Sequence, residues 1–401
     1  MNPESVKDDL RWLTPGVKGI GAASLLSDLG HEVSTALLPR LITSLGGSAA
    51  ALGFIEGISD GLSGLMRLLG GAIADDPVRR RSAAVGGYTV TALLSSLIGV
   101  AVSVWQVGFF RAGAWAARGL RGPSRNALLA DAVPAAAYGR AYGFERAMDN
   151  LGAIGGPLLA LALIAVLSVR TAILLSVIPG LLAVAAILYA IRHIPSLAVG
   201  KRERLRLRVR PVIRGPLGRL FVGIGAFELG NIAATMLILR STELLEPSRG
   251  VSGATSAALL LYLVYNVSAT LISVPAGHAS DRIGPVKVLA GGILFFLMAY
   301  LLFVWAGPSL LLLGAGFVLA GAGIGCAETA EHTAVAVLAP PEVRGSAFGV
   351  LAAIQSFGNF AASGVAGLVW TLASPEAAFF YIAAWMAVAL GSLIVTSASA
   401  A

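Results

Sequence analysis

The chain has 401 residues, of which 57% are hydrophobic and 12% are charged, and its formal net charge at pH 7 is +8. Its mean hydropathy of +0.83 is far too high for a water-soluble protein of this length. The composition therefore predicts a membrane protein and excludes a water-soluble one. The single cysteine, Cys326, excludes an internal disulfide.

Apolar runs of about 20 residues recur along the whole chain, and each can cross roughly 30 Å of hydrocarbon as a helix. The runs lack the ten-residue alternation of outer-membrane barrels, so the predicted fold class is an all-α membrane protein. Twelve transmembrane helices are expected, at residues 17–45, 49–73, 82–104, 106–127, 141–167, 171–191, 217–244, 254–279, 286–306, 309–338, 345–373 and 377–397.

Basic residues gather at every second break between these spans, most densely in KRERLRLRVR at 201–210. The positive-inside rule then places both termini in the cytoplasm. The first apolar run is too long and too charged for a cleavable signal peptide, so we expect a multi-pass protein of a bacterial cytoplasmic (inner) membrane. The basic run lacks interleaved aromatic residues, so we expect it to contact membrane lipids and not nucleic acid.

The two halves of the chain resemble each other. A shift of 200 residues sets Asp28 on Glu228 and His31 on Asn231, and a later shift of 206 sets Gly71 on Gly277, Asp75 on Asp281 and Gly152 on Gly358. Duplication of this kind is typical of transporters built from repeated halves. It predicts two pseudo-symmetric six-helix bundles, at 1–191 and 217–401, joined by a basic cytoplasmic linker at 192–216.

The loop after the second span of each half carries a shared motif. The second copy reads GHASDRIGPVK (277–287) and the first reads GAIADDPVRRR (71–81). Both resemble the G-x-x-x-D-R-x-G-R-R loop of the major facilitator superfamily, and this resemblance covers essentially the whole chain. It implies the twelve-helix fold of that family, alternating access, and a cytoplasmic gate formed by Gly71, Asp75, Gly277, Asp281 and Arg282.

Two further stretches refine the resemblance. NLGAIGGPLLA (150–160) is similar, through Gly156 and Pro157, to a motif of drug–proton antiporters, which favours export. RAGAWAARGLRGPSRNALLAD (111–131) is similar to a pattern from a poorly characterised bacterial branch of the family, although Trp115 departs from that pattern.

Ionisable residues interrupt otherwise apolar spans. Asp28, His31 and Glu32 stand at i, i+3 and i+4, so one face of a helix can carry all three. Glu328, Glu331 and His332 repeat that composition in the tenth span. An ionised group at mid-bilayer costs roughly 2.5–3.5 kcal/mol on insertion scales, so these side chains should face protein or water.

The resemblance brings both sets to a central cavity, because the first, fourth, seventh and tenth helices line that cavity in the family. We expect Asp28, Glu32, Glu328 and Glu331 to carry the coupling protons. The expected substrate-binding residues are His31, Arg111, Trp115, Arg118, Glu228, Asn231 and His332.

The predicted function is proton-coupled export of a small solute by a secondary active transporter that works as a monomer. An alternative is a transporter of a divalent metal ion or its chelate, because Asp, Glu and His at this spacing can converge on one ion. A different class of alternative is a non-transporting receptor or scramblase. No nucleotide-binding, nucleophile-elbow or H-E-x-x-H motif is present, so we expect no enzyme activity, no cofactor and no resident metal.

Overall fold

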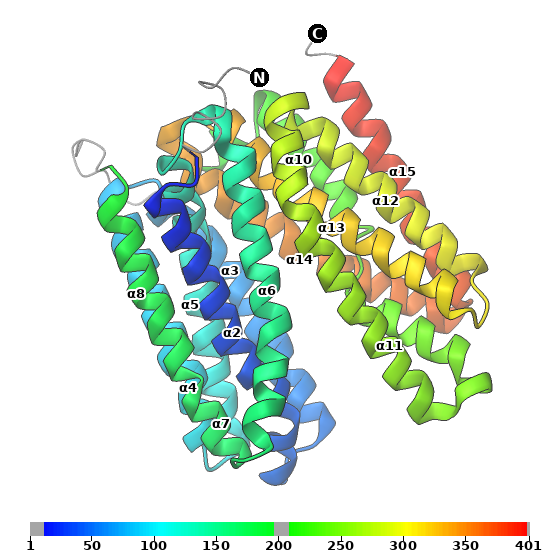
Figure 1. The fold of residues 1–401 in the computed structure, drawn as a ribbon. Coiled ribbons are helices and arrows are strands. Elements are labelled where there is room, and N and C mark those ends of the chain that lie inside the picture. Colours follow the sequence, from blue (N-terminus) through cyan, green and yellow to red (C-terminus); the bar gives the residue numbers. More distant parts are fainter. Residues whose placement is uncertain (1–11, 196–207, 399–401) are drawn as a thin grey trace, which may run out of the picture. The chain divides into compact units, whose positions relative to one another are not determined.

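The computed structural model describes residues 12–195 and 208–398, and within these ranges every regular element is helical. The predicted all-α class is therefore confirmed. The first half contains α2 (Pro15–Ser44), α3 (Ala49–Ala74), α4 (Pro77–Leu97), η1 (Ile98–Val100), α5 (Val104–Asp131), η2 (Ala135–Ala137), α6 (Tyr138–Ile164), α7 (Val169–Leu175), α8 (Val177–His193) and α9 (Val209–Val212). Figure 1 follows these elements from blue to green.

The second half contains the remaining helices. They are α10 (Gly215–Glu228), α11 (Ala234–Ile283), α12 (Pro285–Trp305), α13 (Leu310–Leu338), η3 (Pro341–Val343), α14 (Arg344–Leu372) and α15 (Pro375–Ala398). Most predicted spans match an observed helix to within a few residues. The α11 element covers the end of the seventh predicted span and the whole of the eighth. Between them its backbone kinks at Gly250, whose φ of 67° lies in a region that favours glycine.

Eight of the described helical segments are long and apolar enough to cross a membrane. Helices α2, α3 and α5 are not among them, and each carries several charged side chains along its length. Those side chains must be paired inside the protein or face water. These three helices are therefore where a polar site is expected.

The seventh predicted span, at 217–244, is not one continuous helix. Helix α10 ends at Glu228, and α11 starts at Ala234. Two polar side chains of α14 bond the backbone of the break: the Asn359 amide donates to the Asn231 carbonyl at 2.7 Å, and the Ser363 hydroxyl accepts from the Ala233 amide at 2.9 Å. The prediction of an unbroken helix was wrong. Asn359 and Ser363, more than a hundred residues away in the sequence, bond backbone groups that would otherwise form helical hydrogen bonds.

The chain forms two compact units. The first comprises Met1–Val212 and Val335–Ala353, and the second comprises Ile213–Ala334 and Ile354–Ala401. The end of α13 and the start of α14 thus pack with the N-terminal helices.

In the first unit, α3 and α5 approach closely at glycines. A side chain on Gly119 would meet the Ser63 carbonyl, and one on Gly70 would meet the Leu120 carbonyl. This close crossing is typical of membrane helices. It fixes the charged faces of α3 and α5 against each other.

Candidate functional site

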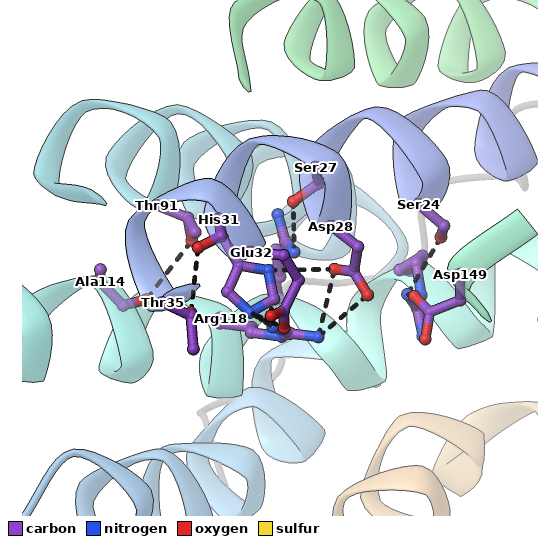
Figure 2. Close-up of polar contacts among 12 residues, drawn as sticks. Ser24, Ser27, Asp28, His31, Glu32, Thr35, Thr91, Ala114, Arg118 and Asp149 are labelled. Atoms are coloured by element: carbon purple, nitrogen blue, oxygen red, sulfur yellow. Dashed lines mark hydrogen bonds and ion pairs between the residues drawn. The ribbon is translucent and has the colours of Figure 1, made fainter. Parts of the chain in front are cut away.

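Ionisable side chains of α2 meet the guanidinium of Arg118 on α5 (Figure 2). One terminal nitrogen of Arg118 lies 3.2 Å and 3.3 Å from the two carboxylate oxygens of Asp28. The other lies 3.0 Å from His31 Nδ1 and also contacts Nε2 of the same ring. Asp28 and His31 are only 4% and 3% exposed. The ion pair of Asp28 with Arg118 and the imidazole ring of His31 therefore form one polar cluster, in which Asp28 and His31 are buried.

Glu32 completes this cluster at its exposed edge. His31 Nε2 lies 3.1 Å from a Glu32 oxygen, and His31 Nδ1 lies 3.5 Å from an Asp28 oxygen. The Glu32 side chain is 26% exposed, whereas that of Asp28 is 6% exposed. The imidazole ring thus lies between a buried carboxylate and a partly exposed one.

Two glycines of α6 allow this face of α2 to be buried. A Cβ atom on Gly152 would come within 2.9 Å of Asp28 Cβ, and one on Gly156 would collide with Glu32 Cβ. Because both positions lack a side chain, α6 packs directly against the acidic face of α2. Gly156, which the sequence analysis took as part of an export motif, therefore also has a packing role.

A second buried arginine joins α3 to α5. Arg111 is 1% exposed, and its guanidinium lies 3.0 Å from a Glu56 oxygen and 3.0 Å from the Thr35 hydroxyl. It also stacks 3.4 Å above the Trp115 ring, whose indole N–H donates to Asp60 at 2.9 Å. Arg111 and Trp115 thus have protein partners, and the exposed groups here are the acids of α3.

A third cluster, which was not predicted from the sequence, is centred on Glu145 of α6. Glu145 is fully buried and accepts from the Ser24 hydroxyl at 2.6 Å. Arg125 and Arg146 each lie 2.8 Å from Glu145, and each also reaches Asp149, at 3.4 Å and 3.2 Å. The signal was present, because Glu145 and Asp149 stand one helical turn apart in a predicted span.

The second unit brings together a different set of acids. Glu228, at the end of α10, is 3% exposed and accepts from the Asn231 amide at 3.0 Å. Glu331 on α13 is fully buried and accepts from the Gln355 amide at 2.7 Å, and its other oxygen has no hydrogen-bond partner among the described residues. Glu228 and Glu328 are the charged groups that act electrostatically on Glu331.

The acids and histidine of α13 do not reproduce the arrangement on α2. His332 bonds the backbone carbonyl of Glu328 at 2.7 Å, whereas Glu331 turns toward Gln355 on α14. Helical spacing alone therefore predicted which residues share a helix but not what each side chain contacts.

The first copy of the loop motif contacts the start of α14 within the first unit. Asp75 accepts from the Ser346 amide at 2.8 Å and from its hydroxyl at 2.5 Å. Burial raises the pKa of the Asp75 carboxyl above its usual range, while the two Ser346 hydrogen bonds act in the opposite direction. Gly71 lies against Gly345 and Gly349. In the second copy, Gly277 is buried and Arg282 is exposed, with Asp281 between these extremes.

Neighbouring charges extend this contact. Arg80, 2% exposed, pairs with Asp131 at 2.5 Å. Arg344 at the start of α14 lies 3.9 Å from the same aspartate and 5.5 Å from the Tyr138 ring. Asp131 and Ser346 are partners that the sequence analysis did not identify.

In the part of the chain that the structure describes, no group of three His, Cys, Asp or Glu side chains is arranged to hold a metal ion. The α2 cluster instead combines groups that gain and lose protons with a cation that can exchange partners. This arrangement can bind a proton and a small polar or charged solute.

Comparison with known proteins agrees with this architecture. The sequence model described as Major Facilitator Superfamily matches residues 20–271 and 245–399. An uncharacterised MFS-type transporter of Methanocaldococcus jannaschii is 29% identical over 385 residues, covering 95% of this chain and 94% of that protein. A gentisate transporter of Corynebacterium glutamicum is 28% identical, covering 74% and 68%. The crystal structure of the human organic anion transporter MFSD10 superposes with a TM-score of 0.74 at 18% identity, covering 98% and 100%.

Proposed function

The chain belongs to the major facilitator superfamily of multi-pass membrane transporters, and on this premise we propose that it moves a small solute by alternating access, driven by protons. The observation that carries the proposal is the α2 cluster, in which Asp28 and His31 contact the Arg118 guanidinium and Glu32 contacts His31. Three proton-binding groups around one movable arginine can exchange partners when a proton arrives.

We assign the coupling protons to Asp28 and Glu32 in the first unit and to Glu328 and Glu331 in the second. Glu32 is the more exposed acid of the α2 cluster, and Glu331 is a fully buried acid bonded only by an amide among the described residues. Buried carboxylates without a full set of cations favour the protonated form, which suits a carrier of protons.

We propose that the solute contacts the following residues of the two units. In the first unit these groups are His31, Arg111, Trp115 and Arg118. In the second unit they are Glu228, Asn231 and His332. Arg118 is 27% exposed and is therefore more accessible than Arg111 or Trp115. The names of the gentisate and organic anion transporters support a small organic solute.

The proposed direction is export, which rests on Gly156 and Pro157 of α6. The proposed location is a bacterial cytoplasmic membrane with both termini in the cytoplasm, which the distribution of basic residues supports. Asp75 and Gly71, with Gly277, Asp281 and Arg282 of the second copy, are proposed as the cytoplasmic gate. A monomer is proposed, because a single chain supplies both bundles.

Flux into proteoliposomes under an imposed pH gradient tests the function. We expect uptake of at least one member of a panel of small organic solutes, beginning with gentisate, to follow the gradient. Asp28→Asn and Glu328→Gln should each lower this flux at least tenfold, whereas Glu246→Gln, a change of an exposed acid on α11, should leave it unchanged. Flux that ignores the gradient would remove proton coupling.

Membrane vesicles of opposite orientation test the direction. For export in exchange for protons, solute should accumulate in inside-out vesicles that are acidified within. Accumulation only in right-side-out vesicles under an inward proton gradient would replace export with import.

A further inference from the structure

His31 is buried among charged groups of both signs. Its ring is 3% exposed and lies edge-on to Trp115, with ring centroids 5.0 Å apart. Carboxylates lie 3.5 Å and 3.1 Å from its two nitrogens, and the Arg118 guanidinium contacts both nitrogens. A histidine with only carboxylate neighbours would favour the charged ring, so the arginine decides what the ring can do.

The hydrogen-bonding capacity of these groups fixes the state of the ring. A guanidinium only donates, so a nitrogen that faces Arg118 has to accept. A neutral ring provides one accepting nitrogen and one N–H, which can point to Glu32 or, in the other tautomer, to Asp28. A charged ring has no accepting nitrogen. The contact with Arg118 is therefore compatible with the neutral ring alone.

We propose that His31 is the proton switch of the first unit: neutral, it accepts a hydrogen bond from Arg118, and its protonation drives Arg118 off Asp28. This inference rests on the proposed proton-coupled transport. The proton binds to the accepting nitrogen of His31, so that both nitrogens donate, one toward Asp28 and one toward Glu32. Two positive groups in direct contact repel each other, and the new imidazolium replaces the guanidinium as the cation beside Asp28.

Differences in exposure determine which partner moves. Arg118 is 27% exposed and has a long, flexible stem, whereas the His31 and Asp28 side chains are 3% and 6% exposed. In this proposal the proton reaches the ring through Glu32, whose side chain is 26% exposed and lies 3.1 Å from His31 Nε2. Arg118 is itself one of the proposed solute contacts. Its release from Asp28 therefore links protonation of His31 to solute binding.

The charges around the ring come from several helices. Besides Asp28 and Glu32 on α2, they are Arg111, Arg118, Arg121 and Arg125 on α5, Glu56, Asp60 and Arg67 on α3, and Asp149 on α6. Helices α4 and α8 carry charged residues only near their ends, at Arg79, Arg80, Arg81 and Arg192. Arg111 is held by Glu56 and Arg121 donates to Ser27 at 2.8 Å, so Arg118 is the cation in contact with the ring.

Nitrogen NMR of histidine tests the switch directly. The full chain, labelled with ¹⁵N-histidine and placed in lipid nanodiscs, contains four histidines, and loss of one signal in His31→Gln identifies His31. We expect the neutral pattern at pH 8 and conversion to the charged pattern when the pH is lowered. A ring that is charged at pH 8 overturns the proposal.

Substitution of Arg118 separates a switch from a merely buried histidine. In Arg118→Gln the titration midpoint of His31 should rise by at least about one pH unit, because the positive charge that disfavours a protonated ring is gone. Arg118→Lys, which keeps the charge and tests whether a folding defect causes the shift, should leave the midpoint nearer to that of the parent. His193, His278 and His332 provide matched controls in the same sample and should not shift. An unchanged His31 midpoint in Arg118→Gln overturns the proposal.

A transport measurement distinguishes this inference from the proposed function. His31→Gln should abolish the pH dependence of flux. Arg118-dependent titration of His31 in a protein whose flux ignores pH would support the switch and remove proton-driven transport. A normal pH dependence of flux in His31→Gln would overturn the switch and leave proton-driven transport intact.

Discussion

The side chain of Glu228 on α10 lies directly against Gly358 on α14: a methyl group on this glycine would come within 2.5 Å of Glu228 Cβ. The first unit contains the same relationship, because a methyl group on Gly152 of α6 would come within 2.9 Å of Asp28 Cβ. These are the residues that the internal repeat aligns. Each unit therefore buries an acid of its first helix against a glycine of its fifth.

This close approach makes Gly358 sensitive to substitution. Gly358→Ala should push α14 away from α10 and displace Glu228, at a cost of about 1–3 kcal/mol for overpacking. Thermal unfolding of the detergent-solubilised protein should show a lower midpoint. Gly364→Ala and Gly367→Ala provide matched controls on the same helix, since nothing lies within 4 Å of a side chain at either position. These controls should be neutral or stabilising, because alanine favours helix over glycine by about 1 kcal/mol. Equal midpoints for all three variants would contradict the packing argument.

The contact between Asp75 and Ser346 predicts an energetic coupling. Ser346 is fully buried and supplies both hydrogen bonds to the carboxylate, so Ser346→Ala should destabilise the protein by about 1.5–3 kcal/mol at pH 7. In a chain that already carries Asp75→Asn, the same change should cost less, because no ionised carboxylate loses its donor. Additive effects in this double-mutant cycle would show that the two residues act independently.

The raised pKa of Asp75 predicts how the cost of Ser346→Ala depends on pH. A carboxyl whose pKa is higher in the folded state contributes stability that is present below its unfolded value, about 3.9, and is lost as the pH rises through the folded value. Loss of the Ser346 hydroxyl raises the pKa further, because hydrogen bonds to the charged form are removed. The stability difference between parent and Ser346→Ala should therefore be larger at pH 7 than at pH 4. In the Asp75→Asn background the difference should not vary with pH, and a pH-independent difference in both backgrounds would rule out Asp75 as its source.

Helical spacing predicted the shared face of Asp28, His31 and Glu32, because the relation between residues three and four apart is set by local geometry. The internal repeat and the loop motif predicted the fold, since both are properties of the linear sequence. The functional roles of these residues stay predictions.

Features that depend on distant packing could not be predicted in this way. The break after Glu228 lies in an apolar stretch, and its polar partners Asn359 and Ser363 belong to α14. Likewise, Glu331 stands at the same spacing as its counterparts on α2, but Gln355 on the neighbouring helix determines its direction. The Glu145 cluster was not predicted because Arg125 and Arg146 were interpreted as basic residues of the cytoplasmic side of the membrane.

The ion pair of Asp28 with Arg118 predicts a large penalty for removal of one partner. Arg118→Gln leaves Asp28 buried without its cation, which should destabilise the first unit by about 3–5 kcal/mol. The double change Asp28→Asn with Arg118→Gln should recover much of that loss. Chemical unfolding in detergent measures both, and Arg282→Gln, a change of an exposed arginine, should stay close to the parent. If the double variant were no more stable than Arg118→Gln, the ion pair would not account for the effect.

Glu331 predicts the opposite pattern, in which loss of the carboxyl costs little stability. In Glu331→Gln, the new side-chain amide keeps an oxygen that can accept from Gln355. The substitution also removes a buried acid that has one unpartnered oxygen among the described residues. Stability should stay within about 1 kcal/mol of the parent, whereas Gln355→Leu, which removes the amide donor, should cost about 1–3 kcal/mol.

Flux driven by a pH gradient should nevertheless fall at least tenfold in Glu331→Gln, because an amide cannot carry a proton. Retained stability with lost proton-driven flux is the result that a structural role for Glu331 cannot produce. A strongly destabilised Glu331→Gln would instead mean that an ionised Glu331 holds the second unit together, and the proposed proton carriers would then be limited to Asp28, Glu32 and Glu328.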